Sequence, residues 1–245
     1  MINQRRCHLP RSGALLTTLL ITLWLSGCAA NTDMTAQQRP DAAEAYTQLG
    51  VAYFERNNLS RALDALSHAL EIAPEHAEAL QALALIYQQQ GETALANEHF
   101  QKALHNAPDF TQARNNFAAF LYEQGNYEAA REQLEIASQA VNYPRRSQLF
   151  TNLGQCYIAL EQIDLARNAL KRAQQIDPRY ARSYYLLAEL EFSQGNDSPA
   201  WQSMQTYLQL TTPDREALQM AIDIAYSRGE DTIANDYQRR LDQFE

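Results

Sequence analysis

Small and apolar residues recur along most of the chain with a period of about 34 residues. Alanines repeat at spacings of 34, 34 and 36 residues, at Ala69, Ala103, Ala137 and Ala173, each with a second alanine seven residues before it. Prolines repeat at spacings of 34, 36, 34 and 35 residues, at Pro74, Pro108, Pro144, Pro178 and Pro213. A fixed period of this length predicts a stack of similar helical units.

The pattern within one period predicts two antiparallel helices that pack closely. Small residues recur where the first helix approaches the second, at Gly50, Ala84, Ala118, Gly154 and Ala188. Larger side chains there would push the helices apart. Four glycines fall in the turn between the helices, where a left-handed residue can end the first helix: Gly91, Gly125, Gly195 and Gly229. The proline that follows ends the second helix.

These positions resemble the consensus of the tetratricopeptide repeat (TPR). In the first repeat the matching residues are Tyr46, Leu49, Gly50, Tyr53, Ala62, Leu66, Ala69 and Pro74. In the second they are Leu80, Leu83, Ala84, Tyr87, Ala96, Phe100, Ala103 and Pro108. The resemblance implies an all-α protein, a TPR superhelix (α-solenoid) of about six helix-turn-helix repeats.

We place the six repeats at 43–76, 77–110, 111–146, 147–180, 181–214 and 215–245. The third repeat contains a two-residue insertion near Asn142-Tyr143-Pro144. The fifth has Tyr207 where the consensus has alanine. The sixth is short and degenerate, as expected of a terminal cap with a more polar outer face. Because the repeats share one continuous core, residues 43–245 are predicted to form a single TPR domain.

Residues 1–27 have the pattern of a lipoprotein signal peptide. Three arginines precede an apolar stretch at 13–25, which leads into Leu25-Ser26-Gly27-Cys28, a lipobox. The small residues fit an extended chain in a peptidase cleft, and the thiol of Cys28 is the nucleophile that accepts the diacylglycerol. A membrane-spanning helix needs about 20 apolar residues, which is more than this stretch provides. We therefore expect cleavage before Cys28 and lipidation of its side chain.

Residues 28–42 are predicted to be a lipidated tether, because they lack apolar periodicity and contain Pro40. Ala29 follows Cys28 directly. An aspartate at this position tends to hold lipoproteins of Gram-negative bacteria at the inner membrane, so we expect the outer membrane, facing the periplasm. More than one acyl chain on Cys28 would make the attachment lasting.

Charge and cysteine content exclude some classes of partner. The formal charge is −9, and loss of residues 1–27 leaves 17 basic and 29 acidic residues, a charge of −12. A chain this acidic is a poor candidate for binding nucleic acid. Cys7 leaves with the signal and Cys28 is acylated, so Cys156 has no partner within the chain. We expect Cys156 to be a buried structural thiol.

Sequence motifs of enzymes and cofactor sites are not found. HExxH, GxSxG, GxxxxGK[ST] and CxxC do not occur in the sequence. The histidines outside the signal are predicted to be scattered surface residues instead of metal ligands: His68, His76, His99 and His105. Most tyrosines are expected in the core, among them Tyr46, Tyr53, Tyr87, Tyr157 and Tyr184, whereas Tyr185 is not. We predict a protein that is not an enzyme and has no cofactor.

The TPR resemblance also predicts where a protein partner binds. In TPRs, positions 2, 5, 9 and 12 of the first helix of each repeat face the concave surface. In the first repeat these are Glu44, Thr47, Val51 and Phe54, and in the second Glu78, Gln81, Leu85 and Gln88. Later repeats contribute Asn115, Tyr122, Gln155, Ile158, Arg182, Tyr185 and Phe192. Val51, Phe54 and Leu85 predict an apolar groove at the N-terminal end, suited to an extended segment or an amphipathic helix. Alternatively, these side chains pack against the tether or a neighbouring repeat.

The central stretch resembles the PilF/PilW family of type IV pilus biogenesis lipoproteins. The residues that carry the resemblance are Asn115-Asn116-Phe117, Phe120-Leu121, Glu123-Gln124-Gly125, Tyr143-Pro144-Arg145, Asn152-Leu153-Gly154-Gln155-Cys156 and Tyr237-Gln238-Arg239-Arg240-Leu241. Membership implies a pilotin, which promotes outer-membrane localisation and oligomerisation of the pilus secretin. Family members can have a cysteine able to pair with the one at Cys156, but Tyr122 occupies that position here, so we expect no such disulfide.

Two other functions stay open. One is a general periplasmic TPR adaptor lipoprotein for envelope or peptidoglycan assembly, which the same repeats and lipobox would serve equally well. The other is an enzyme, or a subunit of one, with an unrecognised site.

Overall fold

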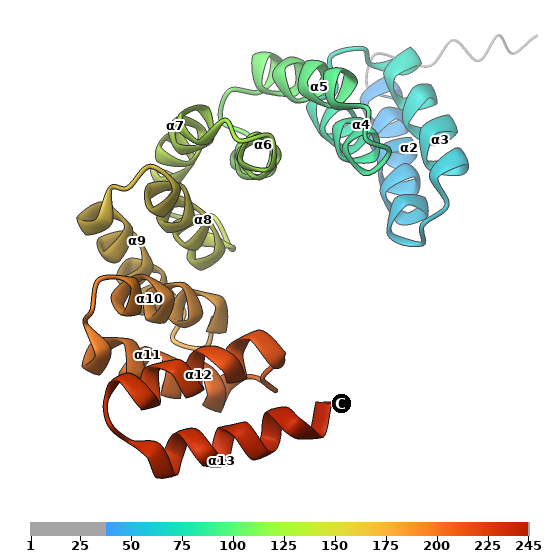
Figure 1. Ribbon diagram of the computed structural model, residues 1–245. Coiled ribbons are helices and arrows are strands. Elements are labelled where there is room, and N and C mark those ends of the chain that lie inside the picture. Colours follow the sequence, from blue (N-terminus) through green and yellow to red (C-terminus); the bar gives the residue numbers. More distant parts are fainter. Residues whose placement is uncertain (1–37, 245) are drawn as a thin grey trace, which may run out of the picture. The chain divides into compact units, whose positions relative to one another are not determined.

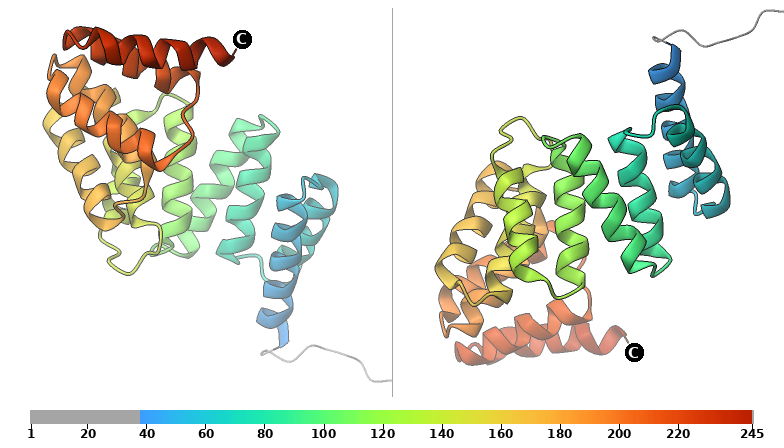
Figure 2. Two further views of the ribbon diagram at one scale, coloured as in Figure 1. Left: turned by 90° about the horizontal axis from the view of Figure 1, so that it is seen from below. Right: turned by 90° about the horizontal axis from the view of Figure 1, so that it is seen from above.

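The computed structural model describes residues 38–244, and all regular secondary structure in that range is helical (Figure 1). The first helices of the six repeats are α2 (Gln38–Glu55), α4 (Ala77–Gln89), α6 (Thr111–Glu123), α8 (Arg146–Ala159), α10 (Ala181–Ser193) and α12 (Arg215–Ser227). The second helices are α3 (Leu59–Ile72), α5 (Thr93–Asn106), α7 (Tyr127–Ser138), α9 (Ile163–Ile176), α11 (Asp197–Leu210) and α13 (Asp231–Leu241), before a short 3-10 helix at Asp242–Phe244. The predicted all-α TPR solenoid is confirmed. Each helix pair lies beside the next in sequence order (Figure 2).

Close approach of the two helices of a repeat depends on small side chains, as the sequence predicts. A Cβ atom added to Gly50 would lie 2.6 Å from Leu66 Cγ, and one added to Gly154 would lie 2.8 Å from Leu170 Cγ. Ala84, the equivalent residue of the second repeat, is fully buried. Large side chains of the second helix, Leu66 and Leu170 beside the two glycines, therefore fill the space at the crossings.

The turns between paired helices use a left-handed residue in every repeat. Gly91, Gly125, Gly195 and Gly229 have φ values between 72° and 77°. In the first and fourth repeats the position is taken by Asn57 (φ 55°) and Glu161 (φ 58°). Asparagine visits this region readily, whereas for glutamate it costs roughly 1–2 kcal/mol.

Helix α2 begins earlier than the sequence analysis expects. It starts at Gln38, so the prediction of a tether at 28–42 is wrong for its last five residues. Pro40 falls in the first turn, where a missing backbone N–H costs nothing, and Asp41 favours the positive end of the helix. The predicted signal peptide, Cys28 and the rest of the tether lie outside the described residues.

The first repeat is less covered than the second. Tyr46 and Leu49 are 40% and 43% exposed, whereas Leu80 and Leu83, at the same positions of the second repeat, are each 4% exposed. Within the described residues no helix pair precedes α2, and the outer face of this helix is therefore open. The prediction that Tyr46 is a core residue is wrong for this reason.

The predicted insertion in the third repeat lies between its second helix and the next repeat. Helix α7 ends at Ser138 and α8 begins at Arg146, so residues 139–145 form the connection. Val141 in this connection is 69% exposed. None of the helices described here is long and apolar enough to cross a membrane.

Candidate partner-binding groove

A groove with a volume of about 560 Å³ lies between α2, α4 and the start of α6. Five of the eight predicted partner-binding residues line it: Thr47, Val51, Phe54, Gln81 and Leu85. These residues lie on α2 and α4, the first helices of two neighbouring repeats. Positions 5, 9 and 12 fall on one face of each helix because an α-helix has 3.6 residues per turn. The predicted cluster therefore exists, and its use by a partner stays a prediction.

The lining residues differ in what they offer a partner. Thr47 and Gln81 are only 3% and 5% exposed, and the Thr47 hydroxyl donates to the Ala43 carbonyl oxygen at 2.8 Å. Val51, Phe54 and Leu85 are half-buried and pack at the edge of the core. The buried polar residues therefore form the floor, while the three apolar side chains keep surface that a ligand could cover.

Two carboxylates line the groove near the N-terminal ends of α2 and α4. Glu44 and Glu78 both line it, and the imidazole of His76 lies between them. His76 Nε2 is 3.3 Å from a carboxylate oxygen of Glu44, and Nδ1 is 3.5 Å from one of Glu78. The side chain of His76 is only 18% exposed, so the prediction of a scattered surface histidine is wrong here.

The opposite end of the groove was missed by the sequence analysis. Phe110, Gln112 and Asn116, at the start of α6, line it together with Arg145. Arg145 is the N-cap residue of α8 and ends the elongated connection. The insertion in the third repeat was the available signal, but a consensus for helix positions does not include connecting residues.

Three predicted binding residues lie elsewhere. Gln88 is absent from the groove lining, and its side-chain amide donates to Glu123 at 2.6 Å. Asn115 is 2% exposed and accepts a 3.1 Å hydrogen bond from the amide of Asn152. Tyr122 lines a different cavity. The eight residues therefore do not form one site.

The second, central cavity lies between α6, α8 and α10 and has a volume of about 370 Å³. Its lining includes Tyr122, Asn152, Gln155, Cys156 and Arg182. Arg182 donates to the Gln155 side-chain oxygen at 2.9 Å, so the polar groups here already bond to one another. Cys156 is a free thiol, 1% exposed, as predicted, and burial raises its pKa to about 12.

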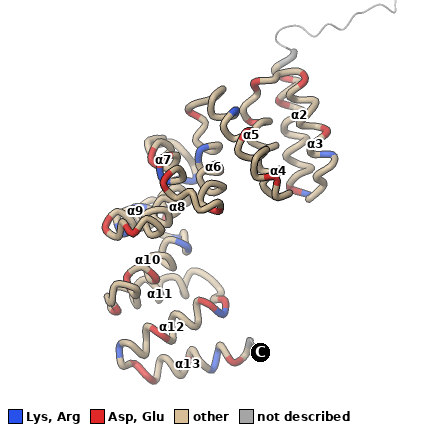
Figure 3. Tube along the Cα trace, turned by 45° about the horizontal axis from the view of Figure 1, so that its top comes forward, with Lys and Arg blue, Asp and Glu red and all other residues tan. Residues whose placement is uncertain are grey.

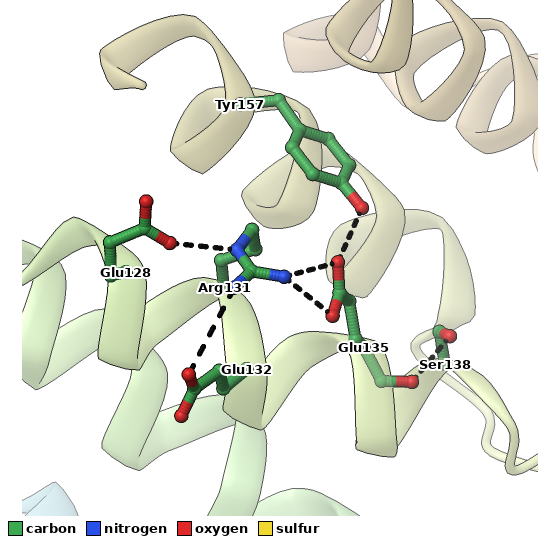
Figure 4. A network of polar contacts seen from close by, with 6 residues as sticks. All are labelled: Glu128, Arg131, Glu132, Glu135, Ser138 and Tyr157. Atoms are coloured by element: carbon green, nitrogen blue, oxygen red, sulfur yellow. Dashed lines mark hydrogen bonds and ion pairs between the residues drawn. The ribbon is translucent and has the colours of Figure 1, made fainter. Parts of the chain in front are cut away.

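A polar network fastens α7 to α8 (Figure 4). Arg131 donates to both carboxylate oxygens of Glu135 at 2.8 Å and to Glu128 at 3.0 Å, and the hydroxyl of Tyr157 donates to Glu135 at 2.8 Å. Burial alone would raise the pKa of Glu135, but the hydrogen bonds from Arg131 and Tyr157 outweigh it and lower the pKa. Burial and the same hydrogen bond raise the pKa of Tyr157 to about 12.

A buried ion pair fastens α9 to α10. Glu191 is 4% exposed and accepts hydrogen bonds from Arg167 Nε at 2.5 Å and from Asn196 at 2.8 Å. Arg167 also contacts the exposed carboxylate of Asp164 at 2.7 Å. Burial raises the pKa of Glu191, but the hydrogen bonds from Arg167 and Asn196 outweigh it, so the pKa is lowered. These contacts lock the later repeats together.

Two further observations concern the later repeats and metal binding. The ring centroids of Tyr185 and Tyr207 lie 5.2 Å apart. Tyr207, which replaces the consensus alanine, therefore packs against Tyr185, which was not expected in the core. Among the described residues no group of three or more His, Cys, Asp or Glu side chains could hold a metal ion.

Paired helices with small residues at the crossings and a groove between first helices define a tetratricopeptide-repeat protein. Tetratricopeptide-repeat family models match residues 43–76, 78–109, 109–179 and 151–214. Proteins with this fold are typically scaffolds for protein interaction. No curated protein matches the chain.

Solved structures narrow the class to one family. PilF from Pseudomonas aeruginosa is 32% identical, with a TM-score of 0.79 over 84% of this chain and 93% of that one. PilW, described as a widely conserved type IV pilus biogenesis factor, is 25% identical, with a TM-score of 0.75 over 81% of this chain and 91% of that one. MamA from Desulfovibrio magneticus RS-1, 21% identical with a TM-score of 0.61 over 69% and 95%, shares the fold alone. The chain belongs to the PilF/PilW family of TPR proteins.

Proposed function

We propose that this protein is an outer-membrane lipoprotein that acts as a pilotin for the type IV pilus secretin. The observation that carries the proposal is the groove between α2, α4 and α6, where Val51, Phe54 and Leu85 keep uncovered apolar surface. The relative PilW is a type IV pilus biogenesis factor, which supports a role in the same process.

The proposed mechanism is binding without chemistry. Acyl chains on Cys28 fix the protein at the inner face of the outer membrane, and the groove holds a segment of a secretin subunit until subunits assemble. A few apolar anchors in a groove supply most of the energy of such a complex. The groove and the lipid therefore have separate tasks, one for capture and one for destination.

Deletion of the gene tests the function. We expect secretin multimers in the outer-membrane fraction and surface pili to fall strongly, measured by immunoblotting and electron microscopy. A plasmid copy of the gene should restore both. Normal multimers and pili in the deletion strain would contradict the pilotin role and favour a general adaptor for envelope or peptidoglycan assembly.

Two variants separate the tasks. Cys28→Ala protein should fold and bind secretin but leave it at the wrong membrane, which membrane fractionation would detect. The triple variant Val51→Ser, Phe54→Ser and Leu85→Ser should reach the outer membrane without capturing secretin. If Cys28→Ala still delivers secretin, the lipid is only an anchor. If the triple variant stays folded and captures secretin normally, the groove is not the binding site.

A further inference from the structure

We infer that the groove between α2, α4 and α6 binds a segment with opposite charges at its two ends, basic over the first two repeats and acidic beside Arg145. This inference rests on the proposed use of the groove for a protein segment. It adds the direction in which charge runs along that segment.

The lining is charged at both ends and uncharged between them. Four charged residues line the groove, and three of them are the carboxylates Glu44, Glu55 and Glu78, all from the first two repeats. The remaining charged residue is Arg145, the N-cap of α8. The other lining residues are uncharged: they are apolar side chains, neutral amides and Thr47. Figure 3 marks the acidic positions of α2 and α4.

Two of the carboxylates lie beside a histidine and keep much of their surface exposed. His76 stands between Glu44 and Glu78, with nitrogen-to-oxygen distances of 3.3 and 3.5 Å. Both carboxylates stay about half exposed, with side-chain exposures of 48% and 53%. Both carboxylates are therefore open to a cation from a partner.

The basic end is free to act on a partner. Arg145 is exposed, and among the described residues no carboxylate lies within ion-pair distance of its guanidinium. By contrast, Arg182 in the neighbouring cavity already donates to Gln155. A guanidinium without an internal partner suits a carboxylate of the bound segment.

Charges at the rim of an interface mainly set orientation and the rate of encounter, while apolar anchors supply affinity. An amphipathic segment could lie in an uncharged apolar groove in either direction. With carboxylates at one end and a guanidinium at the other, one direction pairs both ends and the other opposes like charges. The two ends therefore select a single orientation.

The test is selection of short peptides from a random display library on the purified full-length protein. The double variant Val51→Asp and Phe54→Asp serves as the control for binding in the groove. We expect peptides that bind the wild type but not this control, with an apolar centre, Lys or Arg at one end and Asp or Glu at the other. A peptide of the same composition with mixed charges at both ends should bind roughly three- to tenfold more weakly at low salt. That difference should vanish near about 1 M salt.

Arg145→Glu should change the selection toward peptides that are basic at both ends. The matched control Arg182→Glu places the same change in the neighbouring cavity and should leave the selection unchanged. If groove-dependent peptides show no charge separation, or if Arg145→Glu selects the same peptides as the wild type, the orientation is wrong while the groove stands. If no peptide distinguishes the wild type from the double aspartate variant, the proposed function of the groove fails as well.

Discussion

The groove of the first repeats and the central cavity are built from the same positions of the TPR but differ in what is already bonded. In the central repeats, Asn152 donates to Asn115 and Arg182 donates to Gln155. In the groove, Val51, Phe54 and Leu85 keep apolar surface that no other side chain of the described residues fully covers. A partner in the central cavity would have to replace existing hydrogen bonds, whereas a partner in the groove gains buried apolar area directly.

One repeated unit can therefore serve either as a binding surface or as a scaffold. The central repeats are fastened by polar contacts such as Tyr157 to Glu135 and Arg167 to Glu191. Such contacts hold helices in one arrangement and leave little for a ligand. We therefore expect substitutions in the central repeats to change stability, and substitutions in the groove to change binding.

The largest effect is expected for Glu191→Ala. Removing the buried carboxylate leaves Arg167 with only the exposed carboxylate of Asp164 and leaves the amide of Asn196 without its acceptor. We therefore expect a loss of about 2–3 kcal/mol in the free energy of unfolding, measured by urea denaturation. The control Asp164→Ala removes the other carboxylate that contacts Arg167, which is 93% exposed, and should cost about 0.5 kcal/mol or less. Equal losses in the two variants would contradict a scaffold role for the buried pair.

The same pair makes stability depend on pH. The pKa of Glu191 is lowered in the folded protein, so its contribution is complete above the pKa of an unfolded glutamate, about 4.3, and is lost as pH falls through the folded value. We expect the wild type to lose more stability on acidification below about pH 4.3 than Glu191→Ala does. Parallel curves for the two proteins would rule out this source of acid sensitivity.

The next largest effect is on partner binding, and we expect it only for substitutions in the groove. Phe54→Ala should weaken partner binding by about 2 kcal/mol, roughly 30-fold, because an aromatic anchor in a groove is a typical hot spot. Tyr122→Ala, the matched change in the central cavity, should alter binding less than about twofold, since Tyr122 does not line the groove. Isothermal titration calorimetry measures both. A larger loss for Tyr122→Ala would reverse the assignment of the two regions.

Substitutions at the helix crossings should have a smaller effect on stability, and they again distinguish the groove from the central repeats. A methyl group on Gly154 or Gly50 would press on a leucine of the paired helix, so each change to alanine should cost about 1–2 kcal/mol of stability. Only Gly50→Ala should also weaken partner binding, because Gly50 lies on α2 beside Val51. Loss of binding in Gly154→Ala would show that the central repeats take part.

The smallest effect is a gain in stability. Glu161→Gly should raise the free energy of unfolding by about 1 kcal/mol, since glycine adopts φ 58° without strain. Gly91→Ala, the reverse change in the second repeat, should lower it by about the same amount. Partner binding should be unchanged in Glu161→Gly, and thermal unfolding measures the stability of both. A loss of stability in Glu161→Gly would mean that the Glu161 side chain contributes more than its backbone costs.

The sequence predicts the fold of this protein well because each repeat carries the same local requirements. Small residues at helix crossings, such as Gly50 and Gly154, and left-handed turn residues, such as Gly91, are readable one repeat at a time. The start of α2 was missed because Pro40 reads as a helix breaker unless its place in the first turn is known.

The candidate site was predicted only in part. Val51, Phe54 and Leu85 follow from helix periodicity, but Arg145 reaches the groove from a connection whose path no consensus position describes. Similarly, a consensus assigns Tyr46 to the core without stating whether a preceding repeat exists to cover it. Contacts made between repeats therefore need the structure.

The open outer face of α2 has a consequence for the energetics of binding. In a solenoid each repeat is stabilised by its neighbours, and the first repeat has a neighbour on one side only within the described residues. Its amide hydrogens should therefore exchange faster than those of the central repeats. A segment in the groove contacts both α2 and α4 and replaces part of the missing neighbour, so occupancy would slow that exchange and hinder proteolysis of the first repeat. The protein with a bound segment would then survive proteolysis longer than the free protein.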